Sequence, residues 1–293
     1  MTKTLRKRQF GDSTAAFDDK GVFVVESETQ QATELPINQI VCGDNCEVMR
    51  TLPSESIDLV VTSPPYDDLR TYGGHSWDFE GVVQQLWRVI KPGGVVVWVV
   101  ADATIDGSET GTSFRQALRF KEIGFRIHDT MIYRSSKPPL THKRYEQEHE
   151  FMFVFVKGCL ATFNGIRVKT STFGQNKASR TMRQDSDELG SRSGKGFVAE
   201  TRLKGNVWEI QCGFGHSSCD RVAFNHPAIF PEALARDHIL SWSNEGEIVL
   251  DPFSGSGTTA KMAREMGRKY IGIEVNPEYV EISKTRLEQK LLF

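Results

Sequence analysis

Residues 63–66 read Ser-Pro-Pro-Tyr and directly follow a β-branched run over 57–62 that is typical of a strand. Two successive prolines remove two backbone donors and fix φ at about −65°. The carbonyl of Pro64 and the side chain of Ser63 are therefore expected to be rigid hydrogen-bond acceptors, and Pro65 completes the corner. Tyr66 supplies a flat ring. A polyproline-like turn with a packed aromatic residue is the alternative interpretation of the same residues.

Rigid acceptors of this kind suit an exocyclic amine of adenine or cytosine, whose lone pair is delocalised into its ring. Bonds from its N–H groups to Ser63 and Pro64 would favour a pyramidal nitrogen and stabilise the positive charge that develops there. Tyr66 would stack on the base. Group transfer would be an in-line displacement without a covalent enzyme intermediate. Because that amine is inaccessible in a stacked duplex, the base would have to be flipped out.

A second motif, Asp251-Pro-Phe-Ser-Gly-Ser-Gly-Thr-Thr259, lies between a strand pattern and a helix pattern. Gly255, Gly257 and Ala260 match G-x-G-x-x-A, and Glu274 follows at the end of the next strand pattern. In such turns glycines permit close approach of the backbone to a ligand, and the acidic residue bonds a ribose. A plain glycine-rich turn is the alternative.

Asp251 distinguishes between two cofactors. A carboxylate at this strand end would repel a pyrophosphate, but it would attract the ammonium and sulfonium groups of S-adenosylmethionine (SAM). We therefore predict SAM rather than NAD, with Glu274 accepting hydrogen bonds from the ribose. The ring of Phe253 and the backbone N–H groups of the turn would line the rest of the site: Ser254, Gly255, Ser256, Gly257 and Thr258.

Strand and helix patterns alternate on both sides of these motifs. Strands are expected over 40–42, 57–62, 94–101, 126–133, 150–156, 247–250 and 270–273. Helices are expected over 79–90, 113–123, 228–242, 258–266 and 277–291, with Lys91-Pro-Gly-Gly94 ending the first and turning into the next strand. This alternation predicts one parallel-rich α/β sheet with helices on both faces. The Ser-Pro-Pro-Tyr corner and the glycine-rich turn must then meet at the same sheet edge.

Residues 158–222 interrupt this rhythm. The span 157–204 holds ten Lys and Arg but only four Asp and Glu, so it carries +6 in a chain whose net charge is −2. A basic segment in an otherwise acidic protein indicates a surface for a polyanion, although a solvated loop would have the same charge. The loop 137–145 is also basic and stiffened by prolines. We expect phosphate or base contacts from Lys137, His142, Lys143, Arg144, Lys169, Lys177, Arg180, Arg183, Arg192 and Lys195.

The composition excludes several classes of protein. Hydrophobic residues make up 39% and charged residues 25% of 293 residues, which is ordinary for a globular protein. No apolar run approaches the ~20 residues of a membrane span, and no apolar stretch follows the basic start, so no secretory signal is expected. Five cysteines without a framework spacing favour a reducing cytoplasm. Cys212, His216, Cys219 and His226 match no standard zinc spacing, and no metal is predicted.

The two principal motifs together resemble those of the DNA amino-methyltransferases. Their order, with the catalytic motif first, then an insert, then the SAM motif, resembles the permuted β group of that family. The likeness covers about residues 40–287, and the smaller motifs Gly43-Asp44-Asn45, Lys91-Pro-Gly-Gly94, His149-Glu150 and His226-Pro227 also match. The resemblance implies a Rossmann-like methyltransferase fold, circularly permuted, with a mixed, mostly parallel sheet and an inserted target-recognition region.

The same resemblance assigns further residues and partners. Asp44 would contact the adenine end of SAM, and His226, Pro227 and Phe230 would flank its methionyl pocket. The expected segments are an N-terminal arm (1–36), a catalytic half (37–157), a target-recognition insertion (158–222) and a SAM-binding half (223–293). Double-stranded DNA is the expected substrate, a homodimer and a cognate restriction endonuclease are possible partners, and the cytoplasm of a bacterium, or a phage gene, is the expected setting.

Related enzymes differ in these motifs. Glutamine methyltransferases of release factors carry Asn-Pro-Pro-Tyr after the SAM motif, and cytosine C5 enzymes need a Pro-Cys nucleophile, which this chain lacks. The Ser-Pro-Pro-Tyr motif corresponds to the catalytic tetrad of the DNA amino-methyltransferases. At its first position, Ser is commoner in the cytosine-N4 enzymes of that family and Asp in the adenine-N6 enzymes. Ser63 therefore favours cytosine N4, with adenine N6 left open. The alternatives are an RNA or protein amine methyltransferase, and a DNA-binding regulator with a vestigial site.

Overall fold

The computed structural model describes residues 15–17, 23–25, 34–66, 76–134, 145–176, 180–183, 189–192 and 196–289. The contacts within the chain divide it into two units, Met1–Leu35 and Pro36–Phe293. In the first unit, where the sequence predicts an arm, β1 (Ala15–Phe17) and β2 (Phe23–Val25) form an antiparallel pair. The second unit holds both principal motifs.

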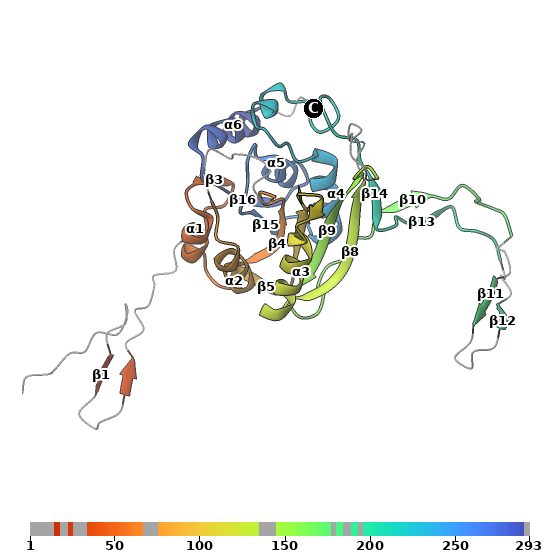
Figure 1. Ribbon diagram of the computed structural model, residues 1–293, viewed down its shortest axis with the longest axis horizontal. Helices are drawn as coiled ribbons and strands as arrows, with labels where there is room; N and C mark the ends of the chain where they lie inside the picture. Colours follow the sequence, from red (N-terminus) through yellow and green to blue (C-terminus); the bar gives the residue numbers. More distant parts are fainter. Residues whose placement is uncertain are drawn as a thin grey trace, which may run out of the picture. The chain divides into compact units, whose positions relative to one another are not determined.

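The second unit is built on an eight-stranded sheet in the order β14-β8-β9-β5-β4-β15-β16-β3 (Figure 1). β9 runs antiparallel to both of its neighbours, and the other pairs are parallel. This confirms the predicted mixed, mostly parallel sheet. The strands are β3 (Gln39–Cys42), β4 (Ile57–Thr62), β5 (Ile90–Val100), β8 (Arg126–Arg134), β9 (His149–Val156), β14 (Val207–Glu209), β15 (Ile248–Asp251) and β16 (Lys269–Glu274).

Helices cover both faces of this sheet, as predicted. α4, α5 and α6 contact one another on one face, and α1, α2 and α3 follow one another on the opposite face (Figure 1). Their bounds are α1 (Asn45–Thr51), α2 (Phe79–Val89), α3 (Thr112–Ile123), α4 (Glu232–Trp242), α5 (Thr258–Glu265) and α6 (Pro277–Glu288), with a short 3-10 helix, η1, at Arg221–Asn225. Because helices cover both faces, central strands such as β5 are buried continuously from Val95 to Val100.

Two element boundaries differ from the sequence prediction. The expected helix over 228–242 begins only at Glu232, because Pro231 adopts an extended conformation at the N-cap and restricts the residue before it. The prediction that Lys91–Gly94 forms a turn after α2 is also wrong. α2 ends at Val89, and β5 begins at once with Ile90 and includes Gly93, whose φ of 85° suits glycine.

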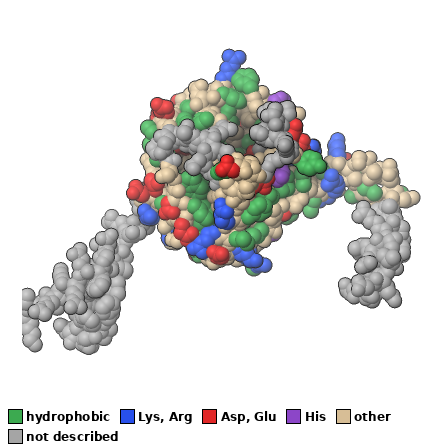
Figure 2. Space-filling model, viewed as in Figure 1, with side chains coloured by type: hydrophobic (Ala, Val, Ile, Leu, Met, Phe, Trp, Pro, Cys, Tyr) green, Lys and Arg blue, Asp and Glu red, His purple; other side chains and the backbone are tan. Residues whose placement is uncertain are grey.

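The insertion contributes both separate ribbons and one strand of the main sheet. β10 (Arg167–Lys169) pairs with β13 (Thr201–Leu203), and β11 (Arg180–Arg183) pairs with β12 (Leu189–Arg192). β14 instead joins the main sheet beside β8. A further small hairpin, β6 (Thr104–Ile105) and β7 (Ser108–Glu109), follows β5. In Figure 2, Lys and Arg side chains lie where β10 and β13 are drawn, whereas Asp and Glu side chains gather around α1.

A buried ion-pair network fastens α6 beneath the glycine-rich turn. Arg286 is fully buried and pairs with Glu232 of α4 at 2.7 Å and with Asp220 at 3.2 Å. Lys261 of α5 contacts the same two carboxylates at 2.8 Å each. Burial opposes ionisation of Asp220, but Lys261 and Arg286 outweigh it and hold the pKa of that carboxyl below its usual value.

Arg286 also bonds the turn directly. Its guanidinium donates to the carbonyl of Ser256 at 2.7 Å and to the Thr258 hydroxyl at 2.9 Å. The helix α6 is therefore fixed to the turn, and the turn is held from below by a charged group with five donors in a planar fork.

We expect Arg286→Met to lower the free energy of unfolding by about 3 kcal/mol, because it leaves a buried carboxylate pair undercompensated. Urea unfolding of the whole chain measures this. Lys284→Met is the matched control on the same helix, since the Lys284 side chain is 51% exposed and pairs with Glu281 only at the surface. Equal losses in the two variants would contradict a stabilising role of the network.

Candidate active site

The two motifs meet at the carboxyl ends of neighbouring parallel strands. β4 ends at Thr62, directly before the Ser-Pro-Pro-Tyr corner, and β15 ends at Asp251, the first residue of the second motif. The Thr62 hydroxyl donates to Asp251 Oδ1 at 2.6 Å, although the residues are 189 positions apart. The predicted meeting of the corner and the turn at one sheet edge is thus confirmed. β4 connects to β5 on one side of this pair, and β15 connects to β16 on the other side. Ligands of open α/β sheets bind at such a switch point, where the strand order reverses.

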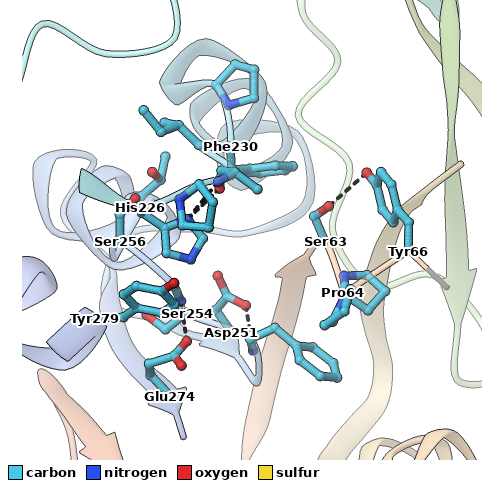
Figure 3. A pocket seen from close by; sticks show the side chains of 18 of the residues that line it. Ser63, Pro64, Tyr66, His226, Phe230, Asp251, Ser254, Ser256, Glu274 and Tyr279 are labelled. Carbon is cyan, nitrogen blue, oxygen red and sulfur yellow. Dashed lines mark hydrogen bonds between the residues drawn. The ribbon is translucent and has the colours of Figure 1, made fainter. Parts of the chain in front are cut away.

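A cavity of about 1010 Å³ opens at this edge. That volume is at the upper end of the range for ligand sites and leaves room for more than one small molecule. Figure 3 shows the Ser63 side of the cavity facing the side formed by Asp251, His226 and Glu274. Its lining includes every residue predicted to act in catalysis or to bind the cofactor: Asp44, Ser63, Pro64, Pro65, Tyr66, His226, Pro227, Phe230, Asp251, Phe253, Ser254, Gly255, Ser256, Thr258 and Glu274, with the exception of Gly257.

The corner holds a chain of hydrogen bonds between side chains. Ser63 Oγ lies 2.9 Å from Tyr66 Oη (Figure 3), and the Tyr66 hydroxyl donates to Glu150 Oε2 at 2.8 Å. Glu150 lies near the start of β9. In the sequence, Glu150 belongs to the His149-Glu150 motif, but nothing local connects it with Tyr66, 84 positions earlier.

Asp251 lies almost entirely within the protein, with 5% of its surface exposed. Burial raises the pKa of its carboxyl from 3.8 to about 6, although hydrogen bonds from Thr62 and from the Phe253 amide favour the ionised form. The carboxylate is therefore poorly solvated and lines a cavity, so it is a strong site for a cationic group. Its partner Thr62 precedes the tetrad, and no local pattern in the sequence indicates that pairing.

The glycine-rich turn has a shape that larger residues would destroy. Gly255 has φ of 51°, and a Cβ there would lie 3.0 Å from Nε2 of His226. Gly257 has φ of 77°, and a Cβ there would lie 2.9 Å from the Ser283 side chain. Gly257 thus serves packing against α6, which agrees with its absence from the cavity lining.

Three backbone amides of this turn are already hydrogen-bonded within the protein. The N–H groups of Ser254, Gly255 and Gly257 already bond the Ile273 carbonyl, Glu274 Oε2 and the Ser254 carbonyl. They give the turn its shape and do not present free donors to a ligand. Two of the three acceptors belong to β16, so these amides also fix the turn to that strand.

Two acidic residues lie at the ends of the strands beyond Asp251. Glu274 ends β16 and accepts the amides of Gly255 at 2.8 Å and Asn276 at 2.9 Å. Asp44 follows the adjacent strand β3, is exposed, and caps α1 by accepting the Glu47 amide at 3.0 Å. Both acids line the cavity, and hydrogen bonds from backbone amides hold their carboxylates in place.

The segment before α4 contributes to the same side of the cavity as Asp251 and Glu274. His226 is buried, its Nδ1 lies 2.8 Å from the Ala228 carbonyl, and its ring makes an edge contact with Tyr279 of α6 at 4.4 Å (Figure 3). Pro227 and Phe230 follow along the same wall. The extended conformation that delays the start of α4 also places these residues at the cavity. Tyr279 was not predicted, because its place near the start of a helix carries no signal.

Aromatic and amide side chains complete the lining. The Phe253 ring contacts the Trp77 ring edge-on, with the ring centroids 4.9 Å apart, and both residues line the cavity. Asn45 donates to the Pro252 carbonyl at 3.4 Å, while its Oδ1 is buried without a partner among the described residues. Ser254 Oγ is also buried and unpaired there. Unpaired buried polar atoms beside Asp251 fit a site that takes a polar, cationic ligand such as SAM.

The predicted DNA-contacting residues are only partly described. Lys169 is exposed on β10. Arg180, Arg183 and Arg192 lie on β11 and β12, for which the structure gives the backbone path only. The remaining six fall outside the described residues: Lys137, His142, Lys143, Arg144, Lys177 and Lys195.

Neither a cluster of metal ligands nor a membrane-spanning helix occurs in the part of the chain that the structure describes. Within the described ranges, no three His, Cys, Asp or Glu residues are grouped so that they could hold a metal ion. None of the helices in that part of the chain has the length and apolar character needed to cross a membrane.

Comparisons with known proteins agree with this geometry. Residues 57–285 match the DNA methylase family of N6 and N4 methyltransferases. Orphan methyltransferase M.BamHII of Bacillus amyloliquefaciens is 51% identical over 240 residues, which cover 81% of this chain and 91% of that protein. DNA adenine methyltransferase YhdJ of Escherichia coli (strain K12) is 31% identical over 261 residues, which cover 85% and 82%.

A solved structure supports the fold and the cofactor. TTHA0409 of Thermus thermophilus, complexed with S-adenosyl-L-methionine, superposes with a TM-score of 0.57 at 26% identity over 85% of this chain and 92% of that one. The family match spans both motifs and the strands that carry them. This chain therefore belongs to the DNA methylase family of N6 and N4 amino-methyltransferases and is a SAM-dependent DNA methyltransferase.

Proposed function

We propose that this protein transfers a methyl group from SAM to the N4 amine of a cytosine flipped out of duplex DNA at a specific sequence. The observation that carries the proposal is the shared cavity, in which Ser63 and Asp251 lie at the ends of hydrogen-bonded strands. One residue offers an acceptor for an amine, and the other a carboxylate for a cation. The reaction requires both groups near the same point.

The amine would be activated by Ser63 and Pro64. Each accepts one N–H bond, which favours a pyramidal nitrogen and stabilises the charge that develops on it. When bound, SAM supplies an electrophilic methyl group, and the N–C bond forms as the S–C bond breaks. Tyr66 stacks on the base, and Pro65 keeps the corner stiff. The side chain of Ser63 is half-buried rather than closed off, so a base that has left the duplex can reach it.

The cofactor would be held by the second motif and its neighbours. Asp251 faces the ammonium and sulfonium end, with His226, Pro227 and Phe230 beside the methionyl chain. Glu274 accepts the ribose hydroxyls, and Asp44 contacts the adenine end. The distribution of these acids supports the assignment, because Glu274 ends β16, the strand beside β15, and Asp44 follows β3, the next strand.

Ser63 supports cytosine N4 as the target. A hydroxyl and a carboxylate both accept an N–H bond, so the preference rests on the resemblance of Ser-Pro-Pro-Tyr to cytosine enzymes. Double-stranded DNA is the proposed substrate, bound by the basic insertion and the loop before β9 in the bacterial cytoplasm. The formation of a homodimer and the existence of a cognate restriction endonuclease are further predictions.

Nucleoside mass spectrometry of duplex DNA incubated with the protein and SAM should reveal N4-methylcytosine. Ser63→Ala should lower kcat at least ~100-fold, because it removes one preorganised acceptor, while the Kd for SAM changes little. Ser108→Ala is the matched control, since Ser108 is exposed and outside the cavity lining. Detection of N6-methyladenine instead would show that adenine is the target base. Methylation of RNA or protein, with no methylation of DNA, would refute the proposal.

The affinity for SAM should weaken as the pH falls below about 6, because the proton on Asp251 then cancels its attraction for the ammonium group. Asp251→Asn should bind SAM weakly and with a flat response between about pH 5 and 7. Calorimetry measures both. Asp129→Asn, outside this cavity, should keep the response of the unchanged protein. A pH-independent Kd in the unchanged protein would contradict the role of Asp251.

Asp251→Asn should have a larger free energy of unfolding than the unchanged protein at neutral pH. The folded pKa of Asp251 is raised, so its stabilising contribution is present at low pH and is lost as the pH rises from about 4 through 6. A shift of about two pH units corresponds to about 3 kcal/mol. Urea unfolding of Asp251→Asn should lack this loss, whereas equal pH dependence in both proteins would count against the burial penalty.

DNA binding should weaken steeply with salt if the insertion contacts phosphates. Lys169→Ala should reduce the slope of log affinity against log salt concentration by about one, as expected for the loss of one phosphate contact. Lys284→Ala, on the exposed face of α6, is the control and should leave the slope unchanged. Identical slopes in all three proteins would remove Lys169 from the DNA surface.

A further inference from the structure

We propose that Glu150 is a positioning residue that acts through Tyr66 to hold the Ser63 hydrogen away from the target amine, so that Ser63 Oγ faces this amine as an acceptor. The inference rests on the proposed function, because it concerns how Ser63 receives the target amine. It assigns Glu150 a role in the reaction although this side chain need not touch the base or SAM.

The geometry of the three side chains carries the inference. Ser63 and Tyr66 lie three residues apart in the corner after β4, and Glu150 reaches them from β9, two strands away in the sheet. The distances of 2.9 Å from Ser63 Oγ to Tyr66 Oη and 2.8 Å from Tyr66 Oη to Glu150 Oε2 are those of good hydrogen bonds. All three residues are half-buried and line the cavity.

The direction of these bonds follows from the number of protons. A carboxylate only accepts hydrogen bonds, so Tyr66 gives its single hydroxyl hydrogen to Glu150. The bond between Ser63 and Tyr66 must then be donated by Ser63. Its own hydrogen is committed to Tyr66, and the lone pairs of Ser63 Oγ are left to accept an N–H from the amine.

If these hydrogen bonds did not run from Ser63 to Tyr66 and on to Glu150, Ser63 could fail as an acceptor even with its position unchanged. If the Ser63 hydrogen were free to rotate, it could point at the amine hydrogens or bond the amine lone pair that must attack the methyl group. Either arrangement would oppose methyl transfer. Glu150 therefore lowers the barrier by excluding these rotamers, and its effect should appear in kcat rather than in the KM for DNA or the Kd for SAM.

The test is a double-mutant cycle on the full chain, with methylation of duplex DNA as the assay. Tyr66→Phe keeps the ring but removes the link, and Glu150→Ala removes the end of the chain. We expect each to lower kcat by about 10- to 100-fold, and the double variant to be no slower than Tyr66→Phe alone, because Glu150 acts through the Tyr66 hydroxyl. Glu150→Gln should recover part of the loss, since its amide oxygen still accepts from Tyr66.

Several controls separate this role from a structural one. Glu209→Ala removes a carboxylate that is 74% exposed and lies outside the cavity, and it should keep full activity. Urea unfolding and SAM calorimetry should show that the cycle variants are folded and bind SAM normally. Losses that multiply in the double variant, or an unchanged kcat in Glu150→Ala, would overturn the inference. Absence of DNA methylation by the unchanged protein would instead refute the proposed function.

Discussion

The hydrogen bond from Thr62 to Asp251 is the contact on which the site depends. It joins the last residues of β4 and β15 at 2.6 Å, and so fixes the Ser-Pro-Pro-Tyr corner relative to the glycine-rich turn. A second bond, from the Thr259 hydroxyl to the Val61 carbonyl at 3.2 Å, ties α5 to the same strand end. Because both strands lie in one parallel ladder, a shift of either motif would have to break the sheet register.

This arrangement has a cost in stability that the rest of the fold offsets. Asp251 is buried where its ionised form is poorly solvated, and its pKa rises accordingly. The network of Arg286, Lys261, Glu232 and Asp220 lies beneath the same turn and binds it to α4 and α6. The glycine-rich turn thus carries one poorly solvated carboxylate, Asp251, toward the cavity, and the ion pairs of the network stabilise it from the other side. Such a combination is common in preorganised sites.

Local sequence patterns predict most of the elements of the fold, although they misplace the start of α4 and the start of β5. The alternation of strands and helices, the two motifs and their meeting edge follow from local patterns, and the structure agrees with each of them. What could not be predicted depends on contacts between distant residues. Glu150 meets Tyr66 only because β9 is inserted antiparallel beside β5, and Arg286 resembles any charged residue of a terminal helix although it is fully buried. The late start of α4 was predictable in principle, since Pro231 disfavours a helical residue before it.

Two of the acids at the site, Asp251 and Glu150, accept hydrogen bonds from hydroxyl groups. Asp251 accepts the hydrogen of Thr62, and Glu150 accepts that of Tyr66. In the arrangement proposed above, Tyr66 accepts the hydrogen of Ser63. At the end of β4, the hydroxyl hydrogens of Thr62 and Tyr66 are therefore bound to carboxylates, and the proposed arrangement leaves the lone pairs of Ser63 Oγ for the amine. A pocket built in this way presents acceptors to any group that enters it. Both groups in the proposed reaction, an amine with N–H donors and a cationic methyl donor, are ones that such a surface attracts, so a single polarity of the cavity serves both substrates.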